Sequence, residues 1–292
     1  MNQKRIFWII LLFLIASLDV SMARQLQQSY GIQKQESQLA NEEEAFATLR
    51  AFELPPDAYR QLAGKEEASE SANDKQQKEL HENILAYLFC QSLQSSDLKD
   101  WKRLEKSARP GLYADYTEIV KKLLADAVWF PVPAAVNDEK TTVSYENSWQ
   151  SERTYGGTRG HEGCDLMASV QQRGYYPIVS VSDGVVEKMG WLPQGGYRIG
   201  IRSRHGVYYY YAHLSEYEEG ITTGMEISAG QLLGYMGDTG YSEVEGTTGN
   251  FPVHLHFGVY LNLEGQSEVS FNPYYLLELL KDRKLNSHVL HT

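Results

Sequence analysis

The segment NFPVHLHFGVY places two histidines, His254 and His256, one residue apart. The apolar residues around them predict a β-strand, on which residues i and i+2 point to the same face. The two imidazole rings would therefore lie side by side. Two neutral rings in such a position contribute little to packing, so the pair indicates a binding role. A His-x-His pattern is weak alone, because a chain with 8 histidines contains roughly 0.2 such patterns by chance.

Two other segments carry residues that complete a metal centre. RGHEGCD contains His161 and, four residues later, Asp165. A catalytic zinc site needs three nitrogen or oxygen ligands and an open position for water. His161, Asp165 and one histidine of the pair would supply two imidazoles and one carboxylate. A metal in such a site lowers the pKa of a coordinated water towards about 7, so the set predicts hydrolytic chemistry.

Hydrolysis also needs a group that takes a proton from the water and returns it to the leaving amine. The other histidine of the pair points to the same face and can serve. His213, in YYAHL, is a second candidate, on a strand where Tyr209, Tyr211 and His213 are predicted to share one face. A single strand histidine is more often an ordinary hydrogen-bonded residue, so the prediction depends on all three segments together. Cys164 is expected to point into the core rather than to the metal.

The elements that must position these residues form a β-rich region. From the segment WFPVP at 129–133 to about Pro273, the chain is rich in Gly, Tyr, Val and Thr. Short alternating segments are separated by tight turns, such as Asp183-Gly184 and His205-Gly206. This pattern predicts an antiparallel β-domain.

The preceding region is predicted to be helical. KELHENILAYLFCQSL places Leu80, Ile84, Tyr87 and Leu88 at helical spacing, and LYADYTEIVKKLLADAV repeats the pattern. LPPDAY begins another helix with a proline in its first turn. The segment NPYYLLELLKDRK near the C-terminus predicts a short capping helix.

The first residues, 1–23, resemble an export signal. Lys4 and Arg5 precede the apolar run 6–18, which is shorter than the roughly 20 residues that span a membrane. Ser21-Met22-Ala23 fits a cleavage site. The alternative is an uncleaved N-terminal anchor in the same orientation. Both interpretations place the protein outside the cytoplasm.

Composition restricts the function further. The formal charge is −11, and no basic run follows the first few residues, which argues against nucleic-acid and anionic-membrane binding. Hydrophobic residues make up 42%, enough for a folded core. The two cysteines, Cys90 and Cys164, fall in different predicted domains, so we expect thiols rather than a disulfide.

At these residues the chain resembles the LytM/lysostaphin-type zinc metallopeptidases. HEGCD, YAHL and VHLHFGVY occur in that order and are similar to the three motifs of this family. The connecting segments PIVSVSDGVVEKMGW, AGQLLGYMGDTGYS and NPYYLL match as well. The resemblance covers roughly 130–277, half of the chain. It implies a mainly β fold, with an antiparallel two-sheet catalytic domain (the duplicated hybrid motif) and a groove across the larger sheet.

The resemblance also implies the roles of individual residues. The zinc ligands, for one Zn²⁺ per chain, would be His161, Asp165 and His256. The catalytic histidines would be His213 and His254. The family has a tyrosine a few residues before the first histidine that helps to stabilise the transition state, and here Tyr155 matches that place.

The prediction is an exported bacterial zinc endopeptidase that cuts peptide crosslinks or stem peptides of peptidoglycan in the cell envelope. The domains would be a signal or anchor at 1–23, a small α-helical region at 24–127, the β-domain at 128–280 and a polar tail at 281–292. The alternative function is an envelope scaffold, or an activator of another wall hydrolase, that uses the same β-domain.

Two departures from the family pattern leave questions open. The segment 241–253 intervenes before His-x-His and is expected to form a loop on the groove rim, with Glu243 and Glu245 adding negative charge. The helical region has no recognisable wall-binding repeat. It could be a spacer, a module that binds an envelope protein, or a plug over the groove.

Overall fold

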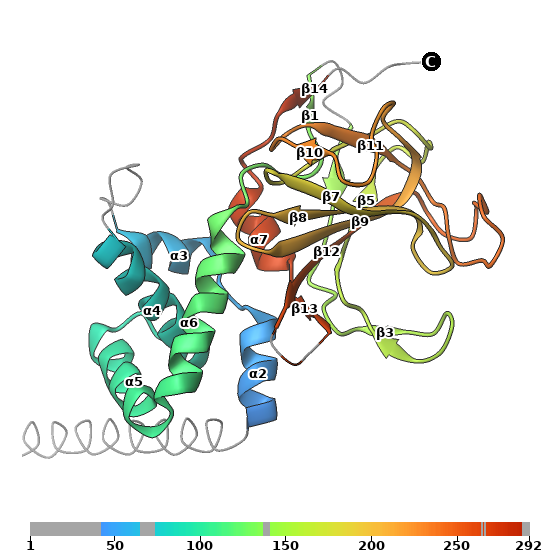
Figure 1. Cartoon of the computed structure of the whole chain (residues 1–292). Coiled ribbons are helices and arrows are strands. Elements are labelled where there is room, and N and C mark those ends of the chain that lie inside the picture. Colours follow the sequence, from blue (N-terminus) through green and yellow to red (C-terminus); the bar gives the residue numbers. More distant parts are fainter. Residues whose placement is uncertain (1–41, 65–73, 137–140, 264, 266, 288–292) are drawn as a thin grey trace, which may run out of the picture. The chain divides into compact units, whose positions relative to one another are not determined.

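The computed structural model describes residues 42–64, 74–136, 141–263, 265 and 267–287 (Figure 1). The chain divides into two compact units between Thr48 and Leu49. The predicted signal or anchor at 1–23 lies outside the described residues. Within the described ranges, no helix is both long enough and apolar enough to cross a membrane.

The helices lie mainly in the first half of the chain, as expected. They are α2 (Glu42–Ala51), α3 (Pro56–Ala63), α4 (Asp74–Cys90), α5 (Ser95–Ala108), α6 (Pro110–Ala125) and, near the C-terminus, α7 (Tyr274–Leu280). Aromatic rings join α4, α5 and α6, since the Phe89 ring lies 5.1 Å from that of Trp101 and 6.3 Å from that of Tyr116. The predicted helices at LPPDAY, KELHENILAYLFCQSL, LYADYTEIVKKLLADAV and NPYYLLELLKDRK are confirmed as α3, α4, α6 and α7.

The second half of the chain is built of strands. They are β1 (Ala134–Ala135), β2 (Val143–Ser144), β3 (Glu152–Arg153), β4 (Arg159–Gly160), β5 (Cys164–Ala168), β6 (Pro177–Val179), β7 (Gly184–Leu192), β8 (Gly196–Ser203), β9 (Val207–Tyr217), β10 (Glu226–Ile227), β11 (Leu232–Met236), β12 (His254–Asn262), β13 (Glu268–Phe271) and β14 (Asn286–Ser287). The main sheet has the order β10-β7-β8-β9-β12-β5-β2, and every pair in it is antiparallel. β11 pairs with both β6 and β9, and β13 pairs with β12.

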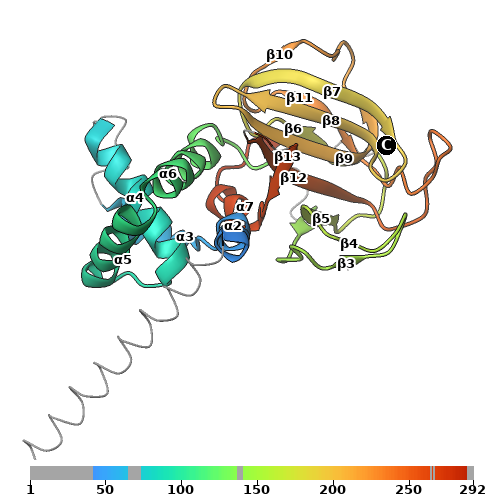
Figure 2. The ribbon, with the colours of Figure 1, turned by 60° about the horizontal axis from the view of Figure 1, so that its bottom comes forward.

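The long central strands lie side by side, with the β3–β4 hairpin close to β5 (Figure 2). One face of β9 packs into the core through Tyr209 and Tyr211, which are fully buried against Phe257 of β12. The fold is therefore mainly β with a small helical region, as predicted. Part of the predicted polar tail forms β14, which pairs in parallel with β1.

One detail of β9 differs from the expectation that Tyr209, Tyr211 and His213 share a face. The register against β8 shifts by one residue between Tyr211 and Leu214, and His213 has a φ of +63°. This β-bulge breaks the alternation, so His213 turns to the same side as Tyr210. Tyr209 and Tyr211 remain core residues.

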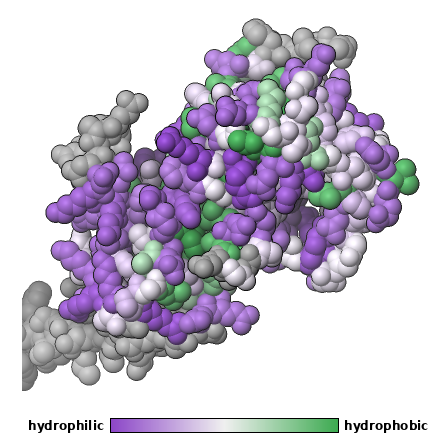
Figure 3. All heavy atoms as spheres, viewed as in Figure 1, coloured by the Kyte–Doolittle hydropathy of each residue, from purple (hydrophilic) through white to green (hydrophobic). Residues whose placement is uncertain are grey.

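The two cysteines are free thiols, as expected. Cys164 is buried, and its Sγ lies 3.5 Å from the carbonyl oxygen of Glu146 rather than with the metal-ligand candidates. Most of the residues on the face drawn in Figure 3 are hydrophilic, in agreement with the acidic composition.

Candidate active site

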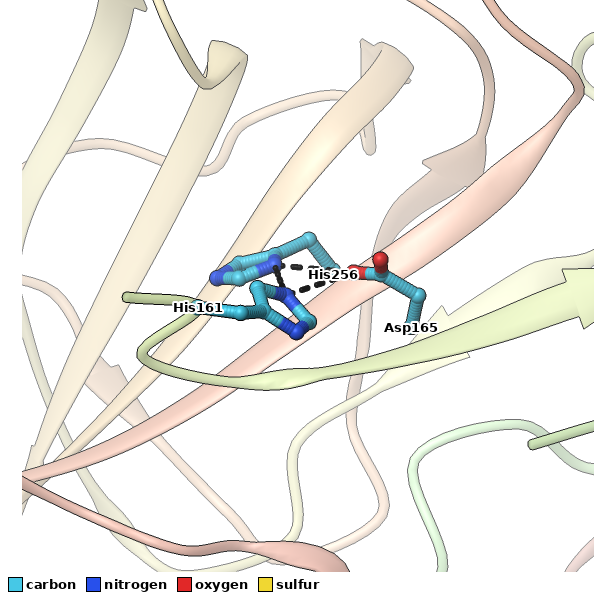
Figure 4. A group of neighbouring side chains, drawn as sticks. All are labelled: His161, Asp165 and His256. Carbon is cyan, nitrogen blue, oxygen red and sulfur yellow. Dashed lines mark hydrogen bonds and ion pairs between the residues drawn. The ribbon is translucent and has the colours of Figure 1, made fainter. Parts of the chain in front are cut away.

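Three predicted ligands meet at one point (Figure 4). His161 Nε2 lies 3.0 Å from His256 Nδ1, and both nitrogens approach Asp165 Oδ1, at 3.1 and 2.9 Å. The three side chains are the group of described residues that could hold a metal ion. His161 is buried, at 4% exposed, and Asp165 and His256 are partly buried.

The strand pairing explains why these residues meet. Asp165 of β5 and His256 of β12 are directly opposed partners in the antiparallel ladder. Directly opposed residues point to the same face of a sheet. His161 enters from the turn before β5, and Gly163 in that turn is needed for close approach. A Cβ atom at Gly163 would lie 2.4 Å from the His256 ring and 2.8 Å from the Phe257 carbonyl oxygen.

The ligand candidates are themselves oriented by neighbours. His161 Nδ1 lies 3.0 Å from Ser148 Oγ and 3.3 Å from the Ser148 carbonyl oxygen, which can accept its proton. Arg153 Nη2 donates to Asp165 Oδ2 at 2.6 Å and also lies 3.0 Å from His161 Nδ1. Such outer contacts fix the orientation of metal ligands.

The cluster favours an ionised Asp165 carboxylate and a neutral His256 imidazole. Burial by itself would raise the pKa of Asp165, but hydrogen bonds from His161 and His256 outweigh it and hold the pKa well below its usual range. Burial lowers the pKa of His256, against the opposing effect of Asp165. A metal ion would replace the proton that His256 Nδ1 shares with Asp165, because a metal binds carboxylate and unprotonated nitrogen.

The two predicted catalytic histidines lie beside the cluster. The rings of His213 and His254 are 4.7 Å apart, and His254 Nε2 lies 3.9 Å from Asp165 Oδ1. His213 Nδ1 donates to the Thr239 carbonyl at 2.8 Å, and His254 Nδ1 donates to the Pro252 carbonyl at 2.7 Å. Since a carbonyl can only accept, the proton of each neutral ring is on Nδ1. Each Nε2 is therefore free to accept a proton.

Burial keeps these two rings neutral. It lowers the pKa of His213 well below the usual value, with a further contribution from His254 and His256, and it also lowers the pKa of His254. Gly196 makes room for the hydrogen bond of His213, because a Cβ atom there would lie 2.2 Å from the Thr239 carbonyl oxygen. The backbone of β8 thus supports the orientation of a histidine on β9.

The donor set fits a zinc ion. Ligand atoms about 2.0–2.2 Å from one tetrahedral ion lie roughly 3.3–3.6 Å from each other. The three ligand atoms of His161, Asp165 and His256 are 2.9–3.1 Å apart, so small outward shifts would fit them around an ion. Two imidazoles and one carboxylate are typical of catalytic zinc sites.

The cluster lines a pocket of about 370 Å³. Its other lining residues are Arg153, Arg159, Gly160, Glu162, Gln194, Gly195, Tyr210, His213, Tyr241, His254 and Tyr260. Tyr155 is not among the lining residues, although its ring stacks on that of Tyr241 with centroids 4.4 Å apart. The ring of Tyr155 is thus held against Tyr241, a residue of the segment 241–253 that lines the pocket.

The segment 241–253 forms a loop at the pocket rim, as predicted. Phe251 packs its ring against His213 at 4.6 Å and against His254 at 5.1 Å, and it also contacts Tyr241 at 4.8 Å. The loop is anchored by the buried carboxylate of Asp238, which accepts from the Gly249 N–H at 2.9 Å. Aromatic rings of the loop therefore cover one side of the two predicted catalytic histidines, His213 and His254.

The structure brings together all the predicted ligands and both predicted catalytic histidines. Sequence analysis missed Arg153, Arg159 and Tyr210. The arginines occur in SERTYGGTRGH, just before His161, and a charged residue so close to a candidate ligand was the available signal. Tyr210 was missed because His213 was expected on the face of Tyr209 and Tyr211, whereas the bulge turns His213 to the face of Tyr210, and that bulge has no clear sequence pattern.

Comparisons with known proteins agree with this site. Residues 159–270 match the model of peptidase family M23. The chain is 36% identical over 204 residues to an L-Ala–D-Glu endopeptidase of Bacillus subtilis (strain 168), an alignment that covers 66% of this chain and 59% of that protein. It is 32% identical over 124 residues to the glycyl-glycine endopeptidase ALE-1 of Staphylococcus capitis, which covers 40% of this chain and 30% of that protein. The chain thus spans less than two thirds of the length of both relatives.

A solved structure extends the similarity over most of the chain. It is that of a candidate glycyl-glycine endopeptidase LytM from Ruminococcus gnavus ATCC 29149. The two share 38% sequence identity with a TM-score of 0.68, over 83% of this chain and 94% of that one. From this similarity and the match of residues 159–270 to the family model, we conclude that this chain belongs to peptidase family M23.

Proposed function

We propose that this chain is an exported zinc-dependent endopeptidase that hydrolyses peptide bonds in peptidoglycan crosslinks or stem peptides. One observation carries the proposal. A three-residue donor set of His161, Asp165 and His256 lies beside two histidines whose Nε2 atoms are free to accept a proton. The membership of family M23 and the endopeptidase relatives support the same reaction.

His161, Asp165 and His256 would hold the metal, with Arg153 orienting Asp165. When bound, zinc polarises the scissile carbonyl and makes water more acidic. His254 accepts the proton of the attacking water at Nε2 and returns it to the leaving amine. His213, 4.7 Å away between ring centroids, assists in this transfer. The hydrogen bonds from each Nδ1 to a carbonyl keep both rings oriented during turnover.

Tyr155 is proposed to donate a hydrogen bond to the developing oxyanion. Its stacking against Tyr241 fixes the ring plane at the rim of the pocket. The Arg159 Nη1 atom donates to the Tyr155 carbonyl at 2.7 Å and restrains the backbone there. Replacement of Tyr155 by Phe would keep the stack and remove the hydroxyl, so it isolates the hydrogen bond.

The location and domain roles follow from the same proposal. Residues 1–23 would direct export, as a cleaved signal or as an anchor, and the enzyme would act in the cell envelope. The β-domain, 128–280, would carry the reaction. The helical region, 24–127, would be available to an envelope protein partner.

Mass spectrometry of peptidoglycan digests tests the function. Purified zinc-loaded protein is incubated with several peptidoglycan types, with and without a chelator. New amine ends that disappear with the chelator are expected, and their identity names the bond. The absence of products from every wall type, despite one bound zinc per chain, would contradict the proposal.

A further inference from the structure

The β3–β4 hairpin opposes two arginines. Arg153 and Arg159 are directly paired across the two strands, so their side chains leave the hairpin on the same face. Like charges in directly opposed positions destabilise a strand pair. Both arginines line the pocket that contains the metal-ligand candidates. The hairpin therefore concentrates positive charge at the pocket at a cost in stability.

Only one of the two charges is balanced within the described residues. Arg153 forms an ion pair with Asp165 at 2.6 Å. Arg159 donates one hydrogen bond, from Nη1 to the Tyr155 carbonyl, and has no carboxylate partner in the described part of the chain. The other acid of the pocket, Glu162, lies 3.5 Å from Arg50 and its side chain is 52% exposed. Arg159 is thus a cation that lines the pocket and has further guanidinium N–H groups that can bind a ligand.

The charge of the pocket contrasts with that of the chain. The whole chain carries −11, whereas the pocket combines Arg153 and Arg159 with a site for a doubly charged ion, against the carboxylates of Asp165 and Glu162. A pocket with an excess of positive charge attracts anionic ligands. A guanidinium matches a carboxylate particularly well, because its parallel N–H groups bind both oxygens.

We propose that Arg159, supported by Arg153, binds a carboxylate that the substrate carries next to the scissile bond. This inference rests on the proposed function and narrows it. The substrate class is an acidic stem peptide, cut beside its D-glutamate, rather than an uncharged glycine crosslink. A D-glutamate that is linked through its side chain leaves its α-carboxylate free. The C-terminal carboxylate of a short stem offers the same chemistry from a second source.

Four synthetic peptides separate these sources. Each contains L-Ala–γ-D-Glu–L-Lys–D-Ala, with the glutamate α-carboxyl group as acid or amide and the C-terminus as acid or amide. kcat/KM is measured with the purified zinc-loaded chain. We expect at least a roughly tenfold preference for the α-carboxylate over the α-amide, from the strength of charge-assisted hydrogen bonds. A preference that follows the C-terminus instead would assign the carboxylate to the chain end.

Arg159→Gln tests the residue. The substitution is expected to reduce the ratio of kcat/KM for the acid over the amide to about one. Arg159→Lys should keep part of the preference, because lysine keeps the positive charge but lacks the two parallel N–H donors of a guanidinium. Arg204→Gln removes one positive charge from an exposed turn and is expected to keep the preference. Zinc content and thermal unfolding of each variant show whether it is folded.

The outcomes distinguish this inference from the function on which it rests. Equal cleavage of all four peptides, or an unchanged preference in Arg159→Gln, would overturn carboxylate recognition and leave the peptidase function intact. Cleavage of whole peptidoglycan but of none of the four peptides would overturn the substrate class alone. If neither peptidoglycan nor any peptide is cut by the zinc-loaded chain, the proposed function fails and the inference falls with it.

Discussion

The helical region and the metal pocket each bury a carboxylic acid, with opposite results. Glu105 of α5 is 2% exposed, and burial raises its pKa, with Arg109 opposing that effect. Asp165 is also largely buried, yet hydrogen bonds from two histidines lower its pKa. Burial alone therefore does not keep a carboxylic acid ionised, as metal binding would require. The hydrogen bonds from His161 and His256 keep Asp165 ionised, because they stabilise its charged form.

The two regions also bury different kinds of side chains. α4 buries aliphatic and aromatic side chains, including Ile84, Leu85 and Phe89. The pocket buries His161, His213 and His254, each less than 10% exposed. An apolar core needs suitable volume and shape, and it tolerates exchanges that keep both. A buried polar cluster needs a partner for each donor and acceptor, so each of its residues has its own required geometry.

Loss of a ligand should produce the largest effect. Asp165→Ala and His256→Ala are expected to lose bound zinc and to lower activity to background, because only two donors of the cluster remain. Metal analysis and peptidoglycan digestion measure both quantities. Full activity in either variant would refute the assignment of ligands.

Loss of a proton acceptor should reduce turnover and leave the metal in place. His254→Ala is expected to keep about one zinc per chain and to lower kcat roughly 10²–10⁴-fold, the usual contribution of general acid–base catalysis. The comparison of zinc content with kcat in the same preparation checks this separation. Loss of zinc together with activity would assign His254 to the ligand set instead.

A cavity in the helical region should affect stability rather than chemistry. Leu85 of α4 is fully buried, and Leu85→Ala is expected to lower the free energy of unfolding by about 2–5 kcal/mol. Zinc content and kcat of the folded protein should not change. The matched control is Leu93→Ala, since Leu93 is 36% exposed. Urea unfolding gives the stabilities, and a fall in kcat below the transition would show that the two regions are coupled.

The loop should contribute a smaller part of the activity. Phe251→Ala removes the ring that contacts both His213 and His254. We expect kcat/KM to fall about tenfold, because the two imidazole rings lose packing contacts that hold their orientation. Val244→Ala is the control, because Val244 belongs to the same loop but is 70% exposed. Equal effects in the two variants would indicate a general disturbance of the loop.

The link between α6 and the sheet should have the smallest effect. Asp126 accepts from the His205 N–H at 2.8 Å. Burial opposes its ionisation, but hydrogen bonds from Ser203 and His205 lower its pKa below the usual value. Because the folded pKa is lowered, this stabilisation is complete above the unfolded pKa of about 4 and is lost as the pH falls through the folded pKa.

Asp126→Asn is therefore expected to lower the free energy of unfolding by about 1 kcal/mol at pH 7, and the difference should narrow below about pH 4. Urea unfolding at pH 7 and below pH 4 measures this difference in the free energy of unfolding. Asp282→Asn, at an exposed position, serves as the control. A difference that is independent of pH would show that the charge of Asp126 is not involved.

Features that depend on nearby residues could be predicted from the sequence, whereas features that depend on distant segments could not. Helices such as α4 were predictable because their apolar periodicity is local. The grouping of the candidate ligands was predictable from short spacings. His254 and His256 lie on one strand, and His161 lies four residues before Asp165, so each pair can occupy only a few relative positions. The bulge at His213 and the contacts of Phe251 with His213 and His254 were not predictable, since they depend on pairing between distant segments.

The opposed positions of Asp165 and His256 have a consequence for how this protein can vary. A slip of one residue between β5 and β12 would turn one of the two side chains to the far face and destroy the centre. Insertions within these strands should therefore be lethal to function. Insertions in the loop 241–253 leave the ladder untouched, so the chain can acquire new surface contacts there while the arrangement of its candidate metal ligands stays the same.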